Sequence, residues 1–583
     1  MNIIKIIKNG LHNLRKSLQR FPLAITCSTL STLLFVYLAG STQIPSGNYD
    51  IERIAMIFAL GFPLYLCIRS IFEKRNNTQF KSRIITQIIA AVLLFLYYFF
   101  FLKEINMVSI SRYIAVNLTL YLSFLYIPYF YKRDNFELYV VKIFSRLSIT
   151  FLYSVVLYAG LSLSLFTIEK LLNVPISGDL YFQTWLLIIG IFAPIFLLAG
   201  VPHENEKIHL KDYPRLFEIL LLYIVMPLIV FYTSILYIYF VKILITQQWP
   251  EGLVSHLVLW YAIVSISVLF SIKPLKKKSK WVSYFLTWLP RILLPLLTML
   301  FIAITMRIKD YGVTENRYYV VLLGIWCSSI LLYYIFSRKK RNIILPLSLA
   351  VISLLSVFGP WSSYSLSIHS QNNRFKNILE KYNMLENNTV VKRDTKISKN
   401  DREELNAILR YFDNNHKIKE IKYLPDNFVL DETDKLFGFS YSPYRYYNND
   451  LDYFSHYISR KNKAFSVKDY DYVLYVSNNN SKIDPLDENT GIEISKSNID
   501  INIERRGKKI YKISLNPILK KLHEKYKNKT NNEYDKKEFI YTDENDNVKV
   551  KYVFERLRGN TEIMNPDNIT FSDLSYFMMI KIK

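Results

Sequence analysis

The sequence has few cysteines and, over its first 361 residues, few acidic side chains. Only three cysteines occur among 583 residues, Cys27, Cys67 and Cys327, so residues 328–583 contain no cysteine. So small a number excludes a disulfide framework, and the lack of a Cys-x-x-Cys pair excludes the usual zinc and thiol redox motifs. Because all three lie inside apolar stretches, we expect them to be small packing residues.

Acidic residues are scarce in the first 361 positions, where 35 Lys and Arg stand against 15 Asp and Glu. Residues 362–583 hold 38 basic and 33 acidic side chains, so most of the formal charge of +25 belongs to the apolar part. A basic protein often binds nucleic acid. Here the basic residues are confined to short connections between apolar stretches, a pattern typical of membrane topology, and no nucleic-acid partner is expected.

Long apolar stretches fill these first 361 residues. A helix needs about 20 mostly apolar residues to cross the hydrocarbon core of a bilayer. The seventh stretch is ambiguous between one span and two, because the apolar run continues from Leu216 to Ile245; we choose one span, with tilt or a kink at Pro227. We predict eleven transmembrane helices, at 21–40, 54–72, 84–102, 113–131, 148–168, 181–201, 216–241, 253–272, 284–306, 318–337 and 343–361.

The connections between the spans alternate in charge. The amino-terminal segment and every second connection after it hold 26 Lys and Arg, whereas the other connections hold eight, with Arg291 left aside. By the positive-inside rule, this bias places the amino terminus in the cytoplasm, and an odd number of spans places residues 362–583 outside it. We therefore expect a multi-pass protein of the plasma membrane.

The first 20 residues have an amphipathic pattern, with Ile and Leu on one helical stripe and Lys and Arg largely off it. This pattern predicts an interfacial helix lying on the inner leaflet of the membrane. Residues 1–40 also resemble a signal peptide. The apolar stretch 21–40 is nevertheless long enough to span the membrane and lacks a clear cleavage site, so we expect it to be retained.

The polar remainder of the chain carries signals for both helices and strands. Its first helix is predicted at 368–386, and a second at 401–412 with Asn400 as the N-cap and Glu403 in the capping-box position. The predicted fold is thus a membrane α-helical bundle of about 11 helices (21–361), preceded by the interfacial helix (1–20) and followed by an extracytoplasmic α+β domain (362–583). Further predicted elements are strands at 470–477, 491–495, 499–504, 509–515, 549–557 and 576–583, and a helix at 517–527.

The densest polar run among the spans is residues 307–318, between the ninth and tenth spans. Asp310, Glu315, Arg317 and Tyr318 are weak candidates for binding a lipid headgroup or a sugar. The alternative is a turn centred on Gly312, with Thr314 capping the next helix and Glu315 at its positive end.

The same run carries a family resemblance. YGVTENRYYVVLLGIW (311–326), FGPWSSYSLSIHSQNNRF (358–375) and FGFSYSPY (437–444) resemble a bacterial multi-pass membrane family catalogued as a domain of unknown function (number 4153). The resemblance implies many spans followed by an extracytoplasmic domain. It brings no established catalytic residues, so the candidates stand on their chemistry alone.

Two further candidates come from single features. Asp50 and Glu52 lie in the first outer loop, where membrane glycosyltransferases that use lipid-linked sugars often carry an acidic pair; such carboxylates bind a divalent ion or act as a base. Two acids at a span terminus are more often simply solvated. Arg291 is the deepest charge within a span, and an intramembrane charge suggests a functional role.

No metal or cofactor site is predicted. His203 and His209 are six residues apart and do not form a His-Glu-x-x-His motif. The acidic runs at 469–471 and 543–547 lack the features of a nucleotide-sugar site and of a calcium loop, and are expected to be turns.

Three classes of function stay open. The first is a non-enzymatic envelope protein that senses, binds or assembles a lipid, glycan or protein ligand on the outer face. The second is a membrane glycosyl- or phospho-group transferase acting on a lipid-linked substrate, and the third is a transporter. The first needs no motif that the sequence lacks, and whether the protein is an enzyme stays undecided.

Overall fold

The structure is a computed structural model of the whole chain, which divides into two compact units, Met1–Tyr441 and Ser442–Lys583. The division falls within the region expected as one domain at 362–583. The two units are described separately. The structure describes residues 15–40, 50–75, 80–130, 135–203, 206, 208–247, 253–338, 340–393, 397–425, 427–439, 441, 451–457, 467–477, 482–483, 492–497, 499–526, 539–562 and 569–583. The predicted interfacial helix therefore lies largely outside the described residues, although 15–20 are helical.

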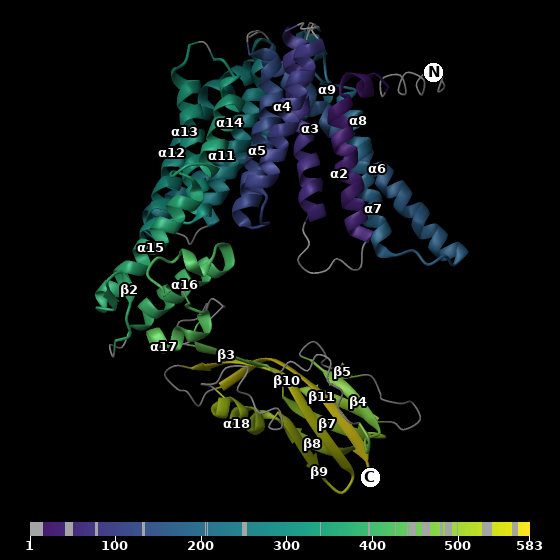
Figure 1. The fold of residues 1–583 in the computed structure, drawn as a ribbon, viewed down its shortest axis with the longest axis vertical. Helices are drawn as coiled ribbons and strands as arrows, with labels where there is room; N and C mark the ends of the chain where they lie inside the picture. Colours follow the sequence, from purple (N-terminus) through teal and green to yellow (C-terminus); the bar gives the residue numbers. More distant parts are fainter. Residues whose placement is uncertain are drawn as a thin grey trace. The chain divides into compact units, whose positions relative to one another are not determined.

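Helices build the first part of unit 1 (Figure 1). In the described part of the chain, ten helical segments are long and apolar enough to cross a membrane. The protein is therefore a multi-pass membrane protein, as predicted. The elements are α2 (Pro22–Gly40), α3 (Asp50–Arg75), α4 (Phe80–Phe101), α5 (Met107–Tyr126), η1 (Ile127–Tyr129), α6 (Phe136–Leu172), α7 (Gly178–Leu187), η2 (Ile188–Phe192), α8 (Ala193–Leu198), η3 (Leu210–Asp212), α9 (Arg215–Ile219), η4 (Leu220–Val225), α10 (Met226–Thr246), α11 (Leu253–Ile272), η5 (Lys273–Lys277), α12 (Lys280–Tyr311), α13 (Glu315–Phe336) and α14 (Ile344–Val357).

Each predicted span corresponds to a helical segment, but the eleventh is shorter than expected. Helix α14 has 14 residues, a length of about 21 Å at 1.5 Å per residue. It ends because Phe358 is extended, Gly359 has a φ of +88° and Pro360 follows, and proline cannot continue the helix. The next helix begins directly after Ser362.

The ambiguous seventh stretch forms one continuous helical segment, Arg215–Thr246. It contains a π-helical stretch, η4, that ends two residues before Pro227. The sixth span repeats this arrangement, since η2 ends two residues before Pro194. Proline has no N–H and its ring clashes with the carbonyl four residues earlier, and a π turn relieves that clash without ending the helix.

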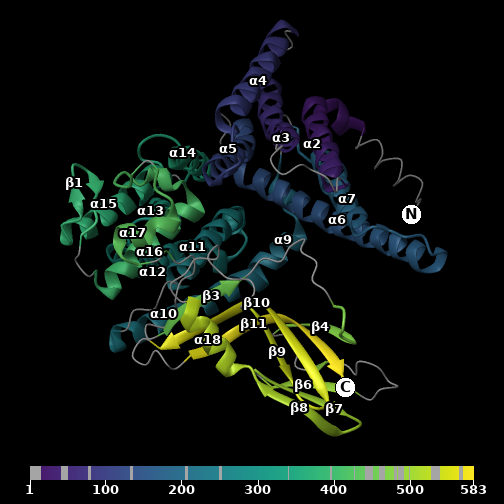
Figure 2. The same ribbon diagram turned by 60° about the horizontal axis from the view of Figure 1, so that its bottom comes forward.

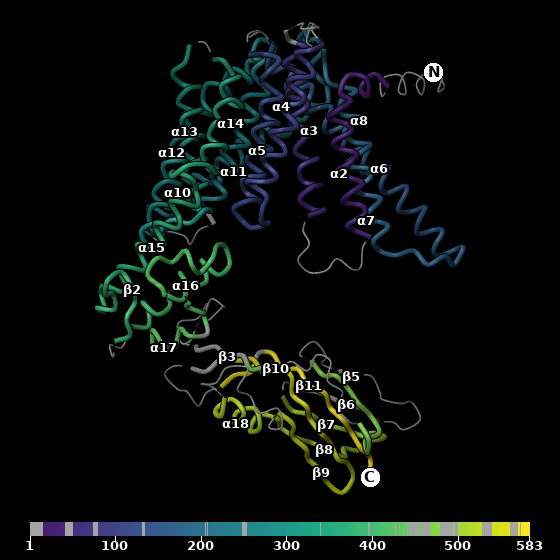
Figure 3. Tube along the Cα trace, viewed as in Figure 1, coloured from purple at the N-terminus to yellow at the C-terminus, as the bar shows by residue number. Residues whose placement is uncertain are grey.

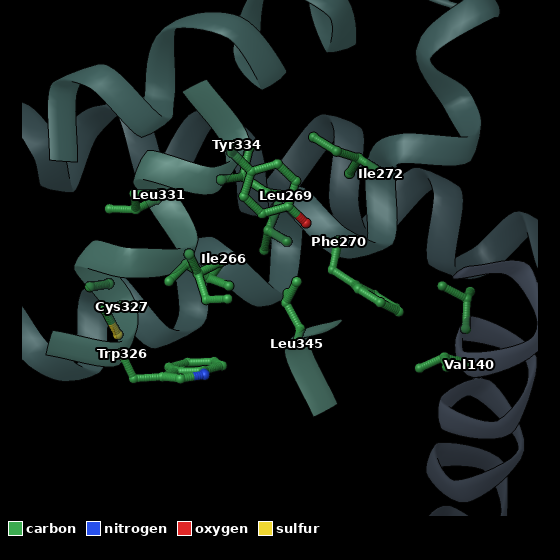
Figure 4. Close-up of a cluster of buried hydrophobic side chains, with 14 of the residues drawn as sticks. Val140, Ile266, Leu269, Phe270, Ile272, Trp326, Cys327, Leu331, Tyr334 and Leu345 are labelled. Carbon is green, nitrogen blue, oxygen red and sulfur yellow. The ribbon is translucent and has the colours of Figure 1, made fainter. Parts of the chain in front are cut away.

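The bundle has an apolar core in which α11, α13 and α14 meet (Figure 4). Ile266 and Leu269 of α11 lie in one cluster with Leu331 and Tyr334 of α13 and with Leu345 of α14. Cys327 is completely buried there, in keeping with the packing role expected for the cysteines.

The chain continues from α14 into a polar helical region that belongs to the same compact unit (Figure 3). Its first helix, α15 (Ser363–Lys381), is capped by Ser362, whose side chain accepts from the backbone N–H of Ser365. The predicted cap of the second helix, Asn400, is wrong: Ser398 accepts from the N–H of Asp401, so the helix starts two residues earlier. The elements are β1 (Leu385–Glu386), β2 (Thr389–Val390), α16 (Lys399–Asn415), η6 (Ile418–Glu420), η7 (Leu430–Glu432) and α17 (Thr433–Phe437).

In its described residues, unit 2 contains two antiparallel sheets and one helix, in agreement with an α+β prediction (Figure 2). One sheet has the order β3-β10-β11-β4, with β9 also paired to β10, and the other has the order β5-β6-β7-β8. Of the acidic run at 543–547, residues 545–547 form the expected turn between β9 and β10, whereas Asp543 and Glu544 belong to β9. The elements are β3 (Leu451–Tyr457), β4 (Tyr472–Val476), β5 (Lys482–Ile483), β6 (Ile492–Ser497), β7 (Asp500–Arg505), β8 (Lys508–Ser514), α18 (Asn516–Tyr526), β9 (Ile540–Glu544), β10 (Val548–Glu562) and β11 (Ile569–Ile582).

Candidate functional site

The polar run at 307–318 forms the end of α12, a turn and the start of α13. Gly312 has a φ of +69° and lies directly after α12, and Thr314 occupies the N-cap position of α13 without making a side-chain cap bond. A Cβ at Gly312 would lie 2.5 Å from Cδ of Arg374. Only glycine therefore fits this turn, for its backbone conformation and for its lack of a side chain.

Helix α15 holds this turn through side-chain hydrogen bonds to the backbone. Nε2 of Gln371 donates to the carbonyl oxygens of Tyr311 (3.2 Å) and Val313 (2.9 Å). The guanidinium of Arg374 donates to the carbonyls of Tyr311 (2.6 Å) and Asp310 (3.0 Å), and also to Oε1 of Glu404 (2.6 Å). These bonds satisfy carbonyls that the end of α12 leaves unpaired.

The most enclosed charged group at this place is Glu315, the first residue of α13. The hydroxyl of Tyr411 donates to its Oε1 at 2.6 Å, and Nε2 of His416 lies 2.8 Å from the same oxygen. The Glu315 and His416 side chains are 6% and 1% exposed. We call these three residues the joint, because they connect α13 to the end of α16.

Burying a carboxylate is costly unless it is paired and hydrogen-bonded. At the joint, two donors meet one oxygen of Glu315, and the positive end of α13 lies beneath it. Burial, followed by the charge of Glu315, raises the pKa of Tyr411, which keeps this phenol a proton donor. The second ring nitrogen of His416, Nδ1, lies 3.5 Å from Oε2 of Glu420.

Aromatic rings enclose the imidazole of His416. The ring centroids of Tyr364, Tyr411 and Phe412 lie 6.5, 5.2 and 6.1 Å from that of His416. Carboxylate, imidazole and phenol are the groups of acid–base catalysis, but such a group must come within hydrogen-bond reach of its substrate. The enclosure of the joint suits a fixed connection between two helices better than a reaction.

The other candidates of the polar run form hydrogen bonds within the turn or with the segments beside it. The carbonyl of Asp310 accepts from Arg374, while Asp310 itself is exposed. Arg317 donates to the carbonyls of Tyr311 (2.9 Å) and Gly312 (2.7 Å), and the hydroxyl of Tyr318 donates to the carbonyl of Trp361 (3.0 Å). These hydrogen bonds thus all involve backbone carbonyls of neighbouring segments.

The remaining candidates lie elsewhere. Asp50 and Glu52 are in the first turn of α3, where Asp50 is 61% exposed and pairs with Arg53 at 2.7 Å. Among the described residues, neither carboxylate is paired with the turn at 310–318. Arg291 is exposed along α12 and donates to the carbonyl of Thr287, one turn earlier.

No group of three or more His, Cys, Asp or Glu side chains that could hold a metal ion occurs in the described ranges.

The fold and the joint together define a class of protein: a multi-pass membrane bundle followed by a polar helical region that is fixed to one of its loops. Residues 29–387 match the model of the family described as Domain of unknown function (DUF4153), and the chain belongs to this family. The matched region contains Glu315, Gln371 and Arg374 but ends before Tyr411 and His416.

A curated relative is the uncharacterized protein PM1469 of Pasteurella multocida (strain Pm70). It is 25% identical over 389 residues, which cover 66% of this chain and 63% of the relative. This chain thus spans less than two thirds of the relative's length. No solved structure matches the chain.

Proposed function

We propose that this chain is a non-enzymatic protein of the bacterial cell envelope that senses, binds or helps to assemble a lipid, glycan or protein partner. The observation that carries the proposal is the joint, in which the first residue of a membrane helix is buried against α16. A partner that favours one arrangement of the polar region would act on α13 through Glu315, because a ligand shifts a protein toward the state it binds better.

A second contact, between two exposed side chains, shows where the end of α16 lies. Nζ of Lys417 lies 2.8 Å from Oε2 of Glu104, which belongs to the segment between α4 and α5. The end of α16 and the residues after it therefore touch two separate connections of the bundle, one beside the joint and one at Glu104. A movement of α16 would therefore displace both connections.

The proposal includes an orientation: a cytoplasmic amino terminus in the plasma membrane, and residues 362–583 outside the cytoplasm. Its support is the distribution of Lys and Arg, 26 in one set of connections and eight in the other. A region outside the cytoplasm would meet envelope lipids, glycans and proteins directly.

The transferase alternative has less support. Asp50 forms an ion pair with Arg53 and is otherwise exposed to solvent. An open groove of about 400 Å³ lies beside η2, but it is lined by Leu161, Leu187, Ile188, Ile191, Phe192, Ile195 and a single hydroxyl residue, Thr184. That lining suits a hydrocarbon chain and offers a sugar phosphate almost no hydrogen bonds.

The experiment is complementation of a deletion strain. We expect Glu315→Gln and His416→Gln each to reduce complementation, because each removes one partner of the joint. The double variant Asp50→Ala with Glu52→Ala should complement fully. The matched control is Glu432→Gln, which makes the same change at a partly exposed carboxylate paired with Lys435.

Loss of complementation by the Asp50/Glu52 variant, with the joint variants active, would contradict the proposal and favour the transferase. Membrane levels of each variant, measured by blotting, separate loss of function from loss of protein.

A further inference from the structure

One face of α12 carries exposed aromatic side chains near the start of the helix. Trp281, Tyr284 and Trp288 are 47%, 64% and 58% exposed, and their spacing of three and four residues places them on one stripe. Val282 and Phe285, on other faces, are buried in the bundle. In a membrane helix, exposed Trp and Tyr rings of this kind lie at the level of the lipid headgroups.

Arg291 continues the aromatic stripe. Its guanidinium donates to the carbonyl of Thr287 and lies 5.8 Å from the centre of the Trp288 ring. Both partners precede Arg291, and long side chains on a helix point toward its amino-terminal end. The charge is therefore directed toward the start of α12, where the aromatic rings are, and away from the helix centre.

Further basic side chains lie near this end of the bundle. Nζ of Lys273 pairs with Oε1 of Glu137 (2.6 Å) and donates to the carbonyl of Lys340 (2.5 Å). Burial, and then the charges of Lys276, Lys273 and Arg291, lower the pKa of Lys340. Lys340 is thus repelled by Lys276 and by Arg291. Within the described residues, none of these three is paired with a carboxylate, whereas Lys273 is.

We propose that Arg291, Lys340 and Lys276 bind the phosphate headgroup of an anionic phospholipid whose acyl chains lie along the exposed face of α12. A phosphate diester would offset the repulsion that Lys340 experiences from Lys276 and Arg291, and basic pockets between membrane helices recognise such headgroups. Trp288 supplies an amphipathic ring at the same level. Ile292 and Ile302, 37% and 43% exposed, extend the face with apolar surface. This site is independent of the joint and of the proposed function.

The experiment uses the full chain, purified in a mild detergent, with phosphatidylglycerol as the probe and native mass spectrometry to count bound lipids. Phosphatidylcholine, which is zwitterionic and has no net charge, is the comparison, and inorganic phosphate is added separately as a competitor. Each basic residue near a membrane surface contributes enough to weaken binding about fivefold when it is lost. We therefore expect Arg291→Gln and Lys340→Gln each to weaken phosphatidylglycerol binding about fivefold, and the double variant to weaken it about 25-fold.

Two further variants make the test specific. Lys309→Gln removes the same charge from an exposed position at the other end of α12 and should leave binding unchanged. The double variant Arg291→Lys with Lys340→Arg keeps the charges and should retain binding, which separates recognition from misfolding.

The proposal is overturned if Arg291→Gln with Lys340→Gln binds phosphatidylglycerol as tightly as the unmodified chain, or if Lys309→Gln weakens binding equally. Displacement of the lipid by millimolar inorganic phosphate would also overturn it, because it would indicate a site for the free anion.

Discussion

Glu315 and His416 are 101 residues apart in the sequence, yet Nε2 of His416 lies 2.8 Å from Oε1 of Glu315. One residue opens a membrane helix and the other follows a polar helix, and both side chains are almost completely buried. Removing one partner of such a buried contact strongly destabilises the fold, because the other partner is left buried and unpaired. The contact therefore holds α16 in one place relative to α13.

The first prediction concerns the energetic coupling within the joint. Glu315→Ala should destabilise the contact between α16 and the bundle by about 3 kcal/mol, because it removes the buried acceptor that the His416 imidazole and the Tyr411 hydroxyl share. Removal of His416 as well should cost much less than the sum of the two single changes. Hydrogen exchange of α16 in the intact protein measures both effects.

Lys417→Gln serves as the control, since it removes an ion pair whose two side chains are both more than half exposed; we expect it to leave the exchange of α16 nearly unchanged. Additive effects of Glu315→Ala and His416→Ala would show that the two side chains are not coupled.

The second prediction concerns Gly312. Gly312→Ala should destabilise the turn by about 1–3 kcal/mol, because its backbone conformation is essentially restricted to glycine and because the new Cβ would meet Arg374. Gly438→Ala is the comparison: Gly438 has a similar φ of +74°, but its ψ of 19° is that of the left-handed helical region, which alanine tolerates better, and its Cβ position is open. Thermal unfolding should show the larger loss for Gly312→Ala; equal losses would mean that neither the ψ of Gly312 nor the contact with Arg374 adds to the cost.

The third prediction concerns pH and the buried imidazole pair of unit 2. Nε2 of His456 on β3 lies 3.1 Å from Nδ1 of His523 on α18. Burial, followed by the nearby His523, lowers the pKa of His456 from about 6.5 to about 4. The unfolded chain therefore takes up a proton more readily than the folded one, so the stability is fully present above pH 6.5 and is lost as the pH falls toward 4.

The loss should amount to about 2–3 kcal/mol and should appear as faster hydrogen exchange in β3 and α18 after correction for the intrinsic pH dependence. His456→Gln should remove this pH dependence, whereas His369→Gln, at an exposed position on α15, should leave it intact. An unchanged profile in His456→Gln would assign the effect to another group.

Much of the fold could be predicted from the sequence because membrane spans and strands have strong periodic or apolar signals. Predicted strands such as 499–504 and 509–515 correspond to β7 (Asp500–Arg505) and β8 (Lys508–Ser514). The bounds of α6 could not be predicted. The helix begins at Phe136, and its first turns contain Glu137, Lys142 and Arg146. Because hydropathy is low around these charged residues, it predicts a loop there. Glu137 and Lys142 then form ion pairs with Lys273 and Glu206.

The candidate site was only partly accessible to sequence reasoning. Glu315 could be predicted as a candidate because it lies in a dense polar run, and the same run predicts that it lies at the start of a helix. His416 and Tyr411 carry no such signal, since their partner is about 100 residues away and their helix has an ordinary amphipathic pattern. The sequence gives no signal for the role of Arg374 either, because its partners are mainly backbone carbonyls.

We propose that residues 362–583 lie outside the cytoplasm and that the basic connections of the bundle lie inside it. Two single-cysteine additions test it in intact cells with a membrane-impermeant maleimide: Asn400→Cys, exposed in α16, and Lys277→Cys, exposed in η5. The three native cysteines are buried and should give little background. We predict that Asn400→Cys is labelled in intact cells and that Lys277→Cys is labelled only after permeabilisation. Labelling of Lys277→Cys in intact cells, with Asn400→Cys protected, would contradict the account.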